Sequence, residues 1–129
     1  MIIDEILLDD VCAQAKHSER LRMNYNFHDS LDAKAQRLLN ALEPGTILPI
    51  HRHRHTAETY ILLRGRIDVV FYNNAGGVTE RFELNPQENK YGVHIPKGQW
   101  HTIEVRESSV IFEVKDGPYI PIEPEDMLD

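Results

Sequence analysis

The first 18 residues have the apolar spacing of a short helix. Ile6, Leu7, Val11 and Ala15 fall at the intervals of one helix face. Acidic residues come early in this stretch and basic residues late, an order that suits the helix dipole. We therefore expect a short helix here, although the two isoleucines near the start can instead begin a short strand.

From the middle of the chain onward, the pattern is that of β-strands. Two strand segments lie within 60–72, divided at Gly65, and a hairpin turn at 73–77 leads to a return strand at 78–84. After a polar loop, further short strands are expected in the ranges 91–95, 101–105 and 110–115. Most of the chain should therefore form sheets.

Two earlier stretches leave alternatives open. Residues 19–30 place Asn24, Asn26 and His28 on one face of an extended chain and aromatic residues on the other. This predicts either an edge strand with its polar side in water, or a polar face that lines a binding pocket and contacts substrate. Residues 33–45 can form a strand, but their Ala, Gln, Arg and Leu content also favours a helix.

Length, charge and cysteine content limit the function classes. A chain of 129 residues suffices for one domain with its own core. The formal net charge of −7 argues against a nucleic-acid partner, because phosphate neutralisation requires a basic surface. No apolar stretch approaches the ~20 residues that span a bilayer, so we expect no membrane partner. A single cysteine, Cys12, excludes an internal disulfide, and with no signal-peptide pattern it predicts a cytoplasmic location.

The candidate chemistry is concentrated in residues 45–65, which contain His51, His53 and Glu58. Successive side chains of a strand point to opposite faces, so a His-x-His pair places both imidazoles on one face, roughly 6.5 Å apart along the chain. Glu58 then stands at the near end of the next strand. Two imidazoles and a carboxylate arranged in this way can bind one metal ion.

A fourth candidate ligand, His101, follows a tight turn formed by Pro96 and Gly98. In the strand that follows the turn, His101 shares its face with apolar residues, which suits a ligand inside a mostly dry barrel. His55 continues the His-x-His alternation and is a possible competing ligand. A turn of the chain before Glu58 would instead place His55 at the rim of the pocket, and we expect this second arrangement.

The two stretches resemble the two halves of the cupin signature. The first half, Gly-x5-His-x-His-x4-Glu-x6-Gly, is matched at every defined position by Gly45, His51, His53, Glu58 and Gly65. The second half, Gly-x5-Pro-x-Gly-x2-His-x3-Asn, is matched at Pro96, Gly98 and His101 and not at Lys90 and Val105. The resemblance implies an all-β fold, a single-domain jelly-roll barrel, and we expect the short N-terminal helix to cover one end of it. It also implies one divalent metal ion held by three histidines and one glutamate, and it favours a strand for 33–45.

Nearly the whole chain is also similar to the WbuC-type cupin-fold metalloproteins. The similarity covers the lead-in at 22–46, the HRH block, the PKGQWHTIEV block and the FEVKDGPY end. It implies a bound metal at the same four residues and an association with bacterial surface-polysaccharide (O-antigen, lipopolysaccharide) biosynthesis. It implies no particular reaction, because that family is itself named for its fold and metal.

Three neutral imidazoles and one carboxylate leave a net charge of about +1 on a divalent ion and, at six-coordination, about two positions open for water or substrate. The ligand set suits Fe, Zn, Mn, Ni or Co. One such ion per chain is therefore the expected cofactor, and ligand type does not choose among these metals.

Three functions fit this site. The first is a metal-dependent isomerase or lyase acting on a small polar molecule such as a sugar derivative, in which His28 or Glu113 moves the proton. The second is an Fe(II) dioxygenase, and the third is a non-catalytic binding or sensor module. A metal-independent sugar-nucleotide epimerase is a weaker rival, because the histidines have metal-ligand spacing.

The expected organisation has three segments. A helix and extended lead-in occupy 1–30, the cupin barrel occupies 31–116, and a proline-rich acidic arm occupies 117–129. Trp100, Tyr119 and the arm offer contact surface, so we expect a homodimer. The other expected partner is a small-molecule ligand or substrate.

Overall fold

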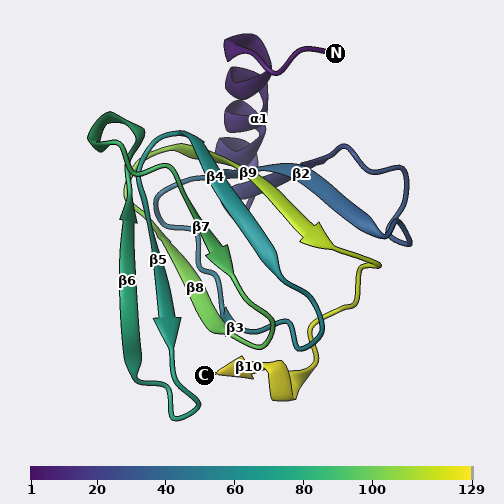
Figure 1. Ribbon diagram of the computed structural model, residues 1–129. Helices are drawn as coiled ribbons and strands as arrows, with labels where there is room; N and C mark the ends of the chain where they lie inside the picture. The colour runs from purple at the N-terminus through teal and green to yellow at the C-terminus, as the bar shows by residue number, and fades with distance from the viewer. Residues whose placement is uncertain (129) are drawn as a thin grey trace.

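The computed structural model describes residues 1–128 and consists mainly of β-strands (Figure 1). Residue 129, the last residue of the predicted arm, lies outside the described residues. No helix within 1–128 is both long and apolar enough to cross a membrane. The elements are α1 (Glu5–His17), β1 (Arg22–Asn26), β2 (Ala35–Leu42), β3 (Ile50–His51), β4 (Glu58–Arg64), β5 (Ile67–Tyr72), β6 (Val78–Leu84), η1 (Pro86–Glu88), β7 (Gly92–Ile95), β8 (Trp100–Val105), β9 (Ser109–Asp116), η2 (Pro124–Asp126) and β10 (Met127–Leu128).

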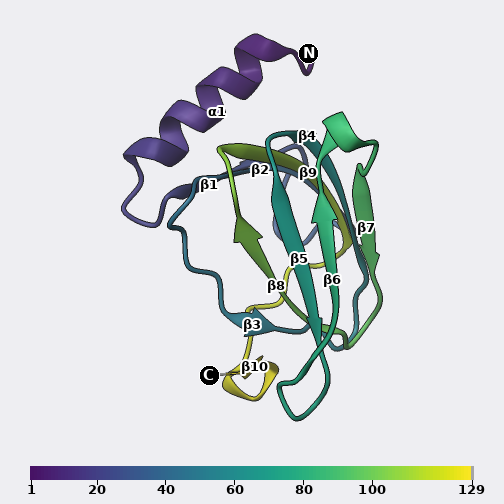
Figure 2. The ribbon, with the colours of Figure 1, turned by 90° about the vertical axis from the view of Figure 1, so that its left-hand side faces the viewer.

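Two five-stranded antiparallel sheets pack face to face (Figures 1 and 2). One sheet has the strand order β1-β2-β9-β4-β7, and the other has the order β10-β3-β8-β5-β6. Apolar side chains from both sheets fill the space between them: Leu42, Tyr60, Leu62, Ile67, Val69, Phe71, Leu84, Ile95, Ile103 and Ile111. This architecture confirms the predicted all-β jelly-roll fold with an N-terminal helix.

Within residues 33–45, Ala35–Leu42 form strand β2 and not the alternative helix. Leu42 faces the core between the sheets, whereas Leu39 and Ala41 face outward and pack under α1. Both faces of β2 therefore bury apolar side chains. A strand covered on both faces lacks the alternation of apolar and polar residues, which is why its sequence also suits a helix.

Helix α1 packs on the outer face of one sheet (Figure 2). It begins after Asp4, whose carboxylate accepts the Leu7 N–H, and Arg64 of β4 pairs with Glu5 and Asp9. Four helix residues are buried against the apolar outer side of β1, β2 and β9: Leu8, Val11, Cys12 and Ala15. The helix is confirmed, but its predicted place over a barrel end is wrong, because this apolar outer face is the surface that it covers.

Strand β1 is the edge strand of its sheet, next to β2. Met23 and Tyr25 pack on the helix side, while Asn24 and Asn26 are exposed. The structure therefore confirms the edge-strand interpretation of residues 19–30.

The C-terminal arm turns back over its own barrel (Figure 1). The N–H of Tyr119 donates to the carbonyl of Leu31, and β10 pairs antiparallel with β3 through Met127 and His51. A two-residue strand has no periodicity, so the sequence pattern did not predict β10. The arm thereby brings its side chains to the same end of the barrel as β3.

Gly65 joins β4 to β5 where no side chain fits. Its φ is +92°, and a Cβ there would lie 2.2 Å from Ser109 Oγ and 2.4 Å from the Ser108 carbonyl oxygen. Gly76 has a similar φ of +85° but no atom within 4 Å of such a Cβ. We expect Gly65→Ala to lower the free energy of unfolding by about 1–3 kcal/mol more than Gly76→Ala, since only Gly65→Ala adds overpacking to the shared backbone strain. Urea denaturation measures the difference, and equal losses would contradict the packing argument.

Candidate metal centre

Four polar side chains from both sheets meet between the sheets. His51 of β3 lies opposite His101 of β8 in one sheet, and Glu58 begins β4 of the other. His53 follows β3 in an irregular segment, where its carbonyl accepts the N–H of Gly98. The predicted strand for the His-x-His pair therefore ends at His51, because the next hydrogen-bond partners come from the arm and a turn. The turn at Gly98 nevertheless holds the backbone of His53 in place.

The four side chains form a compact group. Their ligand atoms all lie within 4.8 Å of one another. Glu58 Oε1 is 2.8 Å from His53 Nε2 and 3.5 Å from His101 Nε2, and the His51 and His101 ring centroids are 4.3 Å apart. Glu58 and His101 are buried, while His51 and His53 are half-buried. The structure thus brings together the four residues that the motif predicted.

Backbone contacts orient two of the imidazoles. His51 Nδ1 is 2.9 Å from the Pro49 carbonyl oxygen, and His101 Nδ1 is 2.9 Å from that of Gln99. A carbonyl oxygen only accepts hydrogen bonds, so Nδ1 carries the proton in both rings and Nε2 presents a lone pair. His101 Nε2 and Glu58 Oε1 are buried, and apart from each other and His53 Nε2 they have no hydrogen-bond partner in the described residues. Converging lone pairs of this kind fit a single divalent ion.

The electrostatics agree with that fit. Burial lowers the pKa of His51 to about 4, with a further effect from His101, so the ring is neutral at pH 7 and keeps its lone pair. Burial alone raises the pKa of Glu58, but the adjoining His101 and His53 outweigh it and hold that pKa well below its ordinary value. Glu58 is therefore a carboxylate, the form that ligates metal.

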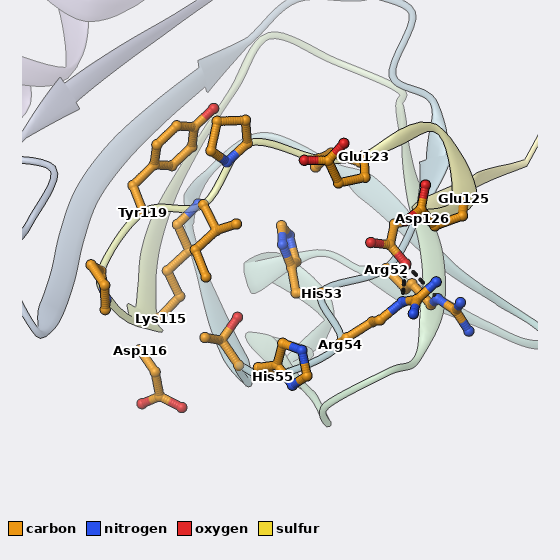
Figure 3. A pocket seen from close by; sticks show the side chains of 15 residues that line it. Arg52, His53, Arg54, His55, Lys115, Asp116, Tyr119, Glu123, Glu125 and Asp126 are labelled. Carbon is orange, nitrogen blue, oxygen red and sulfur yellow. Dashed lines mark hydrogen bonds and ion pairs between the residues drawn. The ribbon is translucent and has the colours of Figure 1, made fainter.

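A cavity of about 230 Å³ opens above His53 (Figure 3). Figure 3 shows His53 at the centre of the lining side chains, with Lys115 and Tyr119 to one side and the arginines to the other. The arm, through residues 118–123, closes part of the opening. This volume lies below the roughly 300–1,000 Å³ of pockets for drug-sized ligands, so the cavity suits a small molecule.

Asp126 fastens the arm over the cavity. Its Oδ1 accepts hydrogen bonds from Arg52 Nε at 2.9 Å and from Arg54 Nε at 2.6 Å (Figure 3). The Arg52 guanidinium also lies 4.4 Å from the ring centroid of Trp100, whose Nε1–H donates to Asn74. Trp100 is only 5% exposed. Trp100 therefore offers little surface to a dimer partner, since its own chain covers it.

A second carboxylate, Glu113, is buried inside the barrel near the cavity. It lies on β9 opposite Tyr60 of β4, and its Oε2 is 3.6 Å from Lys115 Nζ. Burial raises the pKa of Glu113 to about 7, the charge of Glu58 adds to the effect, and Lys115 and Asn40 oppose it. Near neutral pH this carboxyl is present in both protonation states.

The comparisons with known proteins agree with this picture. The family described as a domain of unknown function (DUF6016) matches residues 3–84, which include His51, His53 and Glu58. The chain belongs to this family. No curated protein matches the sequence of the DUF6016 chain.

Solved structures show the fold of the DUF6016 chain. The TT1209 protein from Thermus thermophilus aligns with a TM-score of 0.64 and 19% identity over 90% of this chain and 97% of that chain. A cupin 2 domain-containing protein from Halorhodospira halophila aligns with a TM-score of 0.57 and 17% identity over 79% and 67% of the two chains. KdgF from Halomonas sp. aligns with a TM-score of 0.60 and 13% identity over 78% of this chain and 82% of that chain. The DUF6016 chain therefore has the cupin fold.

His28 does not join the candidate metal centre. It follows β1, and two strands, β2 and β9, separate β1 from β4, which carries Glu58. At about 4.8 Å per strand, that separation is roughly 14 Å. His28 Nδ1 instead lies 3.1 Å from the backbone of Arg37. His55 is exposed and lines the cavity, at the rim where the turn was expected to place it.

Sequence reasoning did not single out three polar residues around Glu113: Asn40, Tyr60 and Lys115. Asn40 Oδ1 is buried and has no hydrogen-bond partner within residues 1–128. Its signal in the sequence is its position between Leu38 and Leu42, where a strand places all three side chains on the same buried face. Lys115 has a similar signal, because it lies two residues after Glu113 and therefore on the same face of strand β9.

Proposed function

We propose that the DUF6016 chain is a metal-dependent enzyme, an isomerase or lyase that transfers a proton on a small polar molecule, with Glu113 as its acid–base group. The observation that carries this proposal is a buried, titratable carboxyl on the face that also bears the metal ligand Glu58. The β4–β9 register pairs Glu58 with Lys115 and Tyr60 with Glu113. Paired residues share a face, so Glu113 lies one layer beyond Glu58 inside the barrel.

The roles divide between the ion and the chain. His51, His53, Glu58 and His101 would hold a divalent ion, which would supply Lewis-acid polarisation of a carbonyl or hydroxyl pair of the substrate. Glu113, with a pKa raised by burial to about 7, both takes and gives a proton at neutral pH. The buried, unpartnered Asn40 Oδ1 can accept a hydrogen bond from a substrate hydroxyl.

A binding or sensor module accounts for fewer of these features. Holding a ligand requires no group that changes charge near pH 7, and burying a carboxyl is costly unless the site uses it. The Fe(II) dioxygenase alternative depends on the metal, which elemental analysis of the purified protein identifies. The sugar-derivative substrate class is part of the proposal, and the small cavity supports it.

We extend the proposal to the setting of the protein. The resemblance to WbuC-type metalloproteins supports a role in bacterial O-antigen biosynthesis, and the single cysteine supports a cytoplasmic location. Exposed apolar side chains on the outer face of β4 and β9, among them Ile61, Leu63 and Val114, support a homodimer.

Solvent deuterium incorporation tests the proposed enzyme. The protein, with its metal content measured, is incubated in D₂O with a panel of small hydroxy aldehydes, hydroxy ketones and sugar acids, and NMR follows loss of proton signal. We expect incorporation into at least one class, loss of incorporation after chelator treatment, and recovery when the metal is returned. A fully metallated protein that binds panel members without exchanging any proton would contradict the enzyme and favour the binding module.

A further inference from the structure

We infer that Lys115 is the anion-binding residue of this site and that the substrate carries a carboxylate, as a small hydroxy or oxo acid does. The inference rests on the proposed function, because it names the substrate class of the same cavity. In this arrangement the carboxylate faces Lys115, and a neighbouring oxygen of the substrate faces the metal ligands.

Lys115 stands beside the metal centre. It pairs with Glu58 across the β4–β9 ladder, which places the two side chains on the same face with Cβ atoms about 5 Å apart. Its side chain is 18% exposed and lines the cavity together with His53 (Figure 3). A ligand that reaches His53 is therefore within reach of the Lys115 ammonium.

The ammonium has donors to offer. Lysine carries three N–H donors, and none of those on Lys115 makes a hydrogen bond within residues 1–128. Glu113 Oε2 lies 3.6 Å from Nζ, beyond the roughly 2.7–2.9 Å of a charge-assisted hydrogen bond, and the Tyr119 ring centroid lies 5.8 Å away. By contrast, the Nε donors of Arg52 and Arg54 are both held by Asp126. Both guanidinium groups keep Nη donors, so Lys115 is distinguished from the arginines by its place beside Glu58 on the β4–β9 ladder.

The charge of the inner site favours an anion. A divalent ion (+2), Glu58 (−1) and Lys115 (+1) sum to about +2, and ionised Glu113 lowers this to about +1. The sum stays positive in both protonation states of Glu113. Three acidic residues that line the cavity, Asp116, Glu123 and Glu125, are exposed to water, which screens their charge.

A carboxylate fits better than a phosphate. A single lysine, with Glu113 3.6 Å away, suits a monoanion, whereas a phosphate dianion would bring a second negative charge toward that carboxyl. Phosphate sites also commonly use arginine forks or backbone N–H groups, and the arginines of this cavity hold the arm. The cavity of about 230 Å³ has room for a short-chain acid.

Matched titrations test the inference. Glycolate, its neutral amide glycolamide, and inorganic phosphate are titrated into the Zn²⁺-loaded protein by calorimetry, with metal content and melting temperature recorded for every variant. We expect Lys115→Met to weaken glycolate binding by about 10- to 100-fold and to leave glycolamide binding unchanged. Lys115→Arg should retain most of the glycolate affinity. The control is Lys90→Met, an exposed lysine outside the cavity, which should bind like the parent.

Three outcomes overturn the inference. An unchanged preference for glycolate in Lys115→Met would assign that preference to the metal alone. Absence of glycolate binding to the zinc-loaded parent would remove the anion site, and tighter binding of phosphate than of glycolate would replace the carboxylate by another anion. None of these three results contradicts the proposed enzyme, because deuterium exchange and metal content test it independently. Failure of the parent protein to bind zinc would instead refute the proposed function itself.

Discussion

The Glu113→Gln variant is expected to lose about 100- to 10,000-fold in the rate of deuterium incorporation while keeping its metal. Groups that transfer a proton in the transition state contribute rate factors of this size. Glutamine preserves the shape of Glu113 but cannot exchange a proton at neutral pH. The matched control is Glu107→Gln, an exposed glutamate in the turn between β8 and β9, which should react like the parent.

The same variant has a second readout that does not depend on a substrate. Burial raises the pKa of Glu113 from 4.5 to about 7, so the folded protein binds a proton that the unfolded chain releases across this window. Stability due to this group is present below pH 4.5 and falls as pH rises toward 7. At about 1.36 kcal/mol per pKa unit, the loss is about 3 kcal/mol.

Below pH 4.5, the free energies of unfolding of the metal-free parent and of Glu113→Gln should therefore change with pH in the same way. Between pH 4.5 and 8 the parent should lose stability relative to the variant. Urea denaturation at several pH values gives this comparison. A constant difference across the range would show that Glu113 titrates as an ordinary carboxyl. A normal exchange rate in Glu113→Gln would remove it from the reaction.

The metal ligands could be predicted from the sequence because their spacing is tied to strand geometry. The residues between His53 and Glu58 form one turn that leads into β4. The turn from Pro96 to Gly98 fixes where His101 enters β8. These relations are local, so residue types and spacing are sufficient to identify the group. Strand β3 is only two residues long, but the group still forms. Strand β8 pairs with β3 at His51, and the Gly98 N–H holds the His53 carbonyl.

The environment of Glu113 could not be predicted in the same way. Strand β9 alternates between Val110, Phe112 and Val114 on one face and Ile111, Glu113 and Lys115 on the other. Helix α1 covers much of the first face, so both faces carry apolar residues and the pattern does not say which one points inward. Only the pairing of β9 with both β2 and β4 decides this, and that pairing joins residues more than 45 positions apart.

The arm and His28 illustrate the same limit. The Asp126 contacts with Arg52 and Arg54 join residues more than 70 positions apart, so nothing in the local sequence indicates them. His28 has the residue type expected of a proton carrier, but strand order places it about three strands from Glu58. Residue type identifies candidates, and long-range strand order decides which of them can act together.

The His51→Ala/His101→Ala double variant is expected to lose the metal. Four-ligand zinc sites are worth about 10–16 kcal/mol, so removing two ligands should weaken binding by at least about 1,000-fold. Elemental analysis of the parent, purified without added metal or chelator, should show near-stoichiometric metal, and the double variant should show traces. The His55→Ala/His94→Ala variant removes two exposed histidines outside the group and should keep its metal.

Metal binding to the folded state also raises thermal stability, which separates loss of the site from loss of the fold. Adding Zn²⁺ at about 100 times its dissociation constant should stabilise the parent by about 2.7 kcal/mol and leave the double variant unchanged. His101 is fully buried, so the single His51→Ala variant, in which a half-buried ring is lost, guards against a folding defect. Equal traces of metal in parent and variant, with no rise in melting temperature, would contradict the metal centre. Glu113 and Lys115 would then belong to a metal-free barrel that binds its ligand by hydrogen bonds and charge.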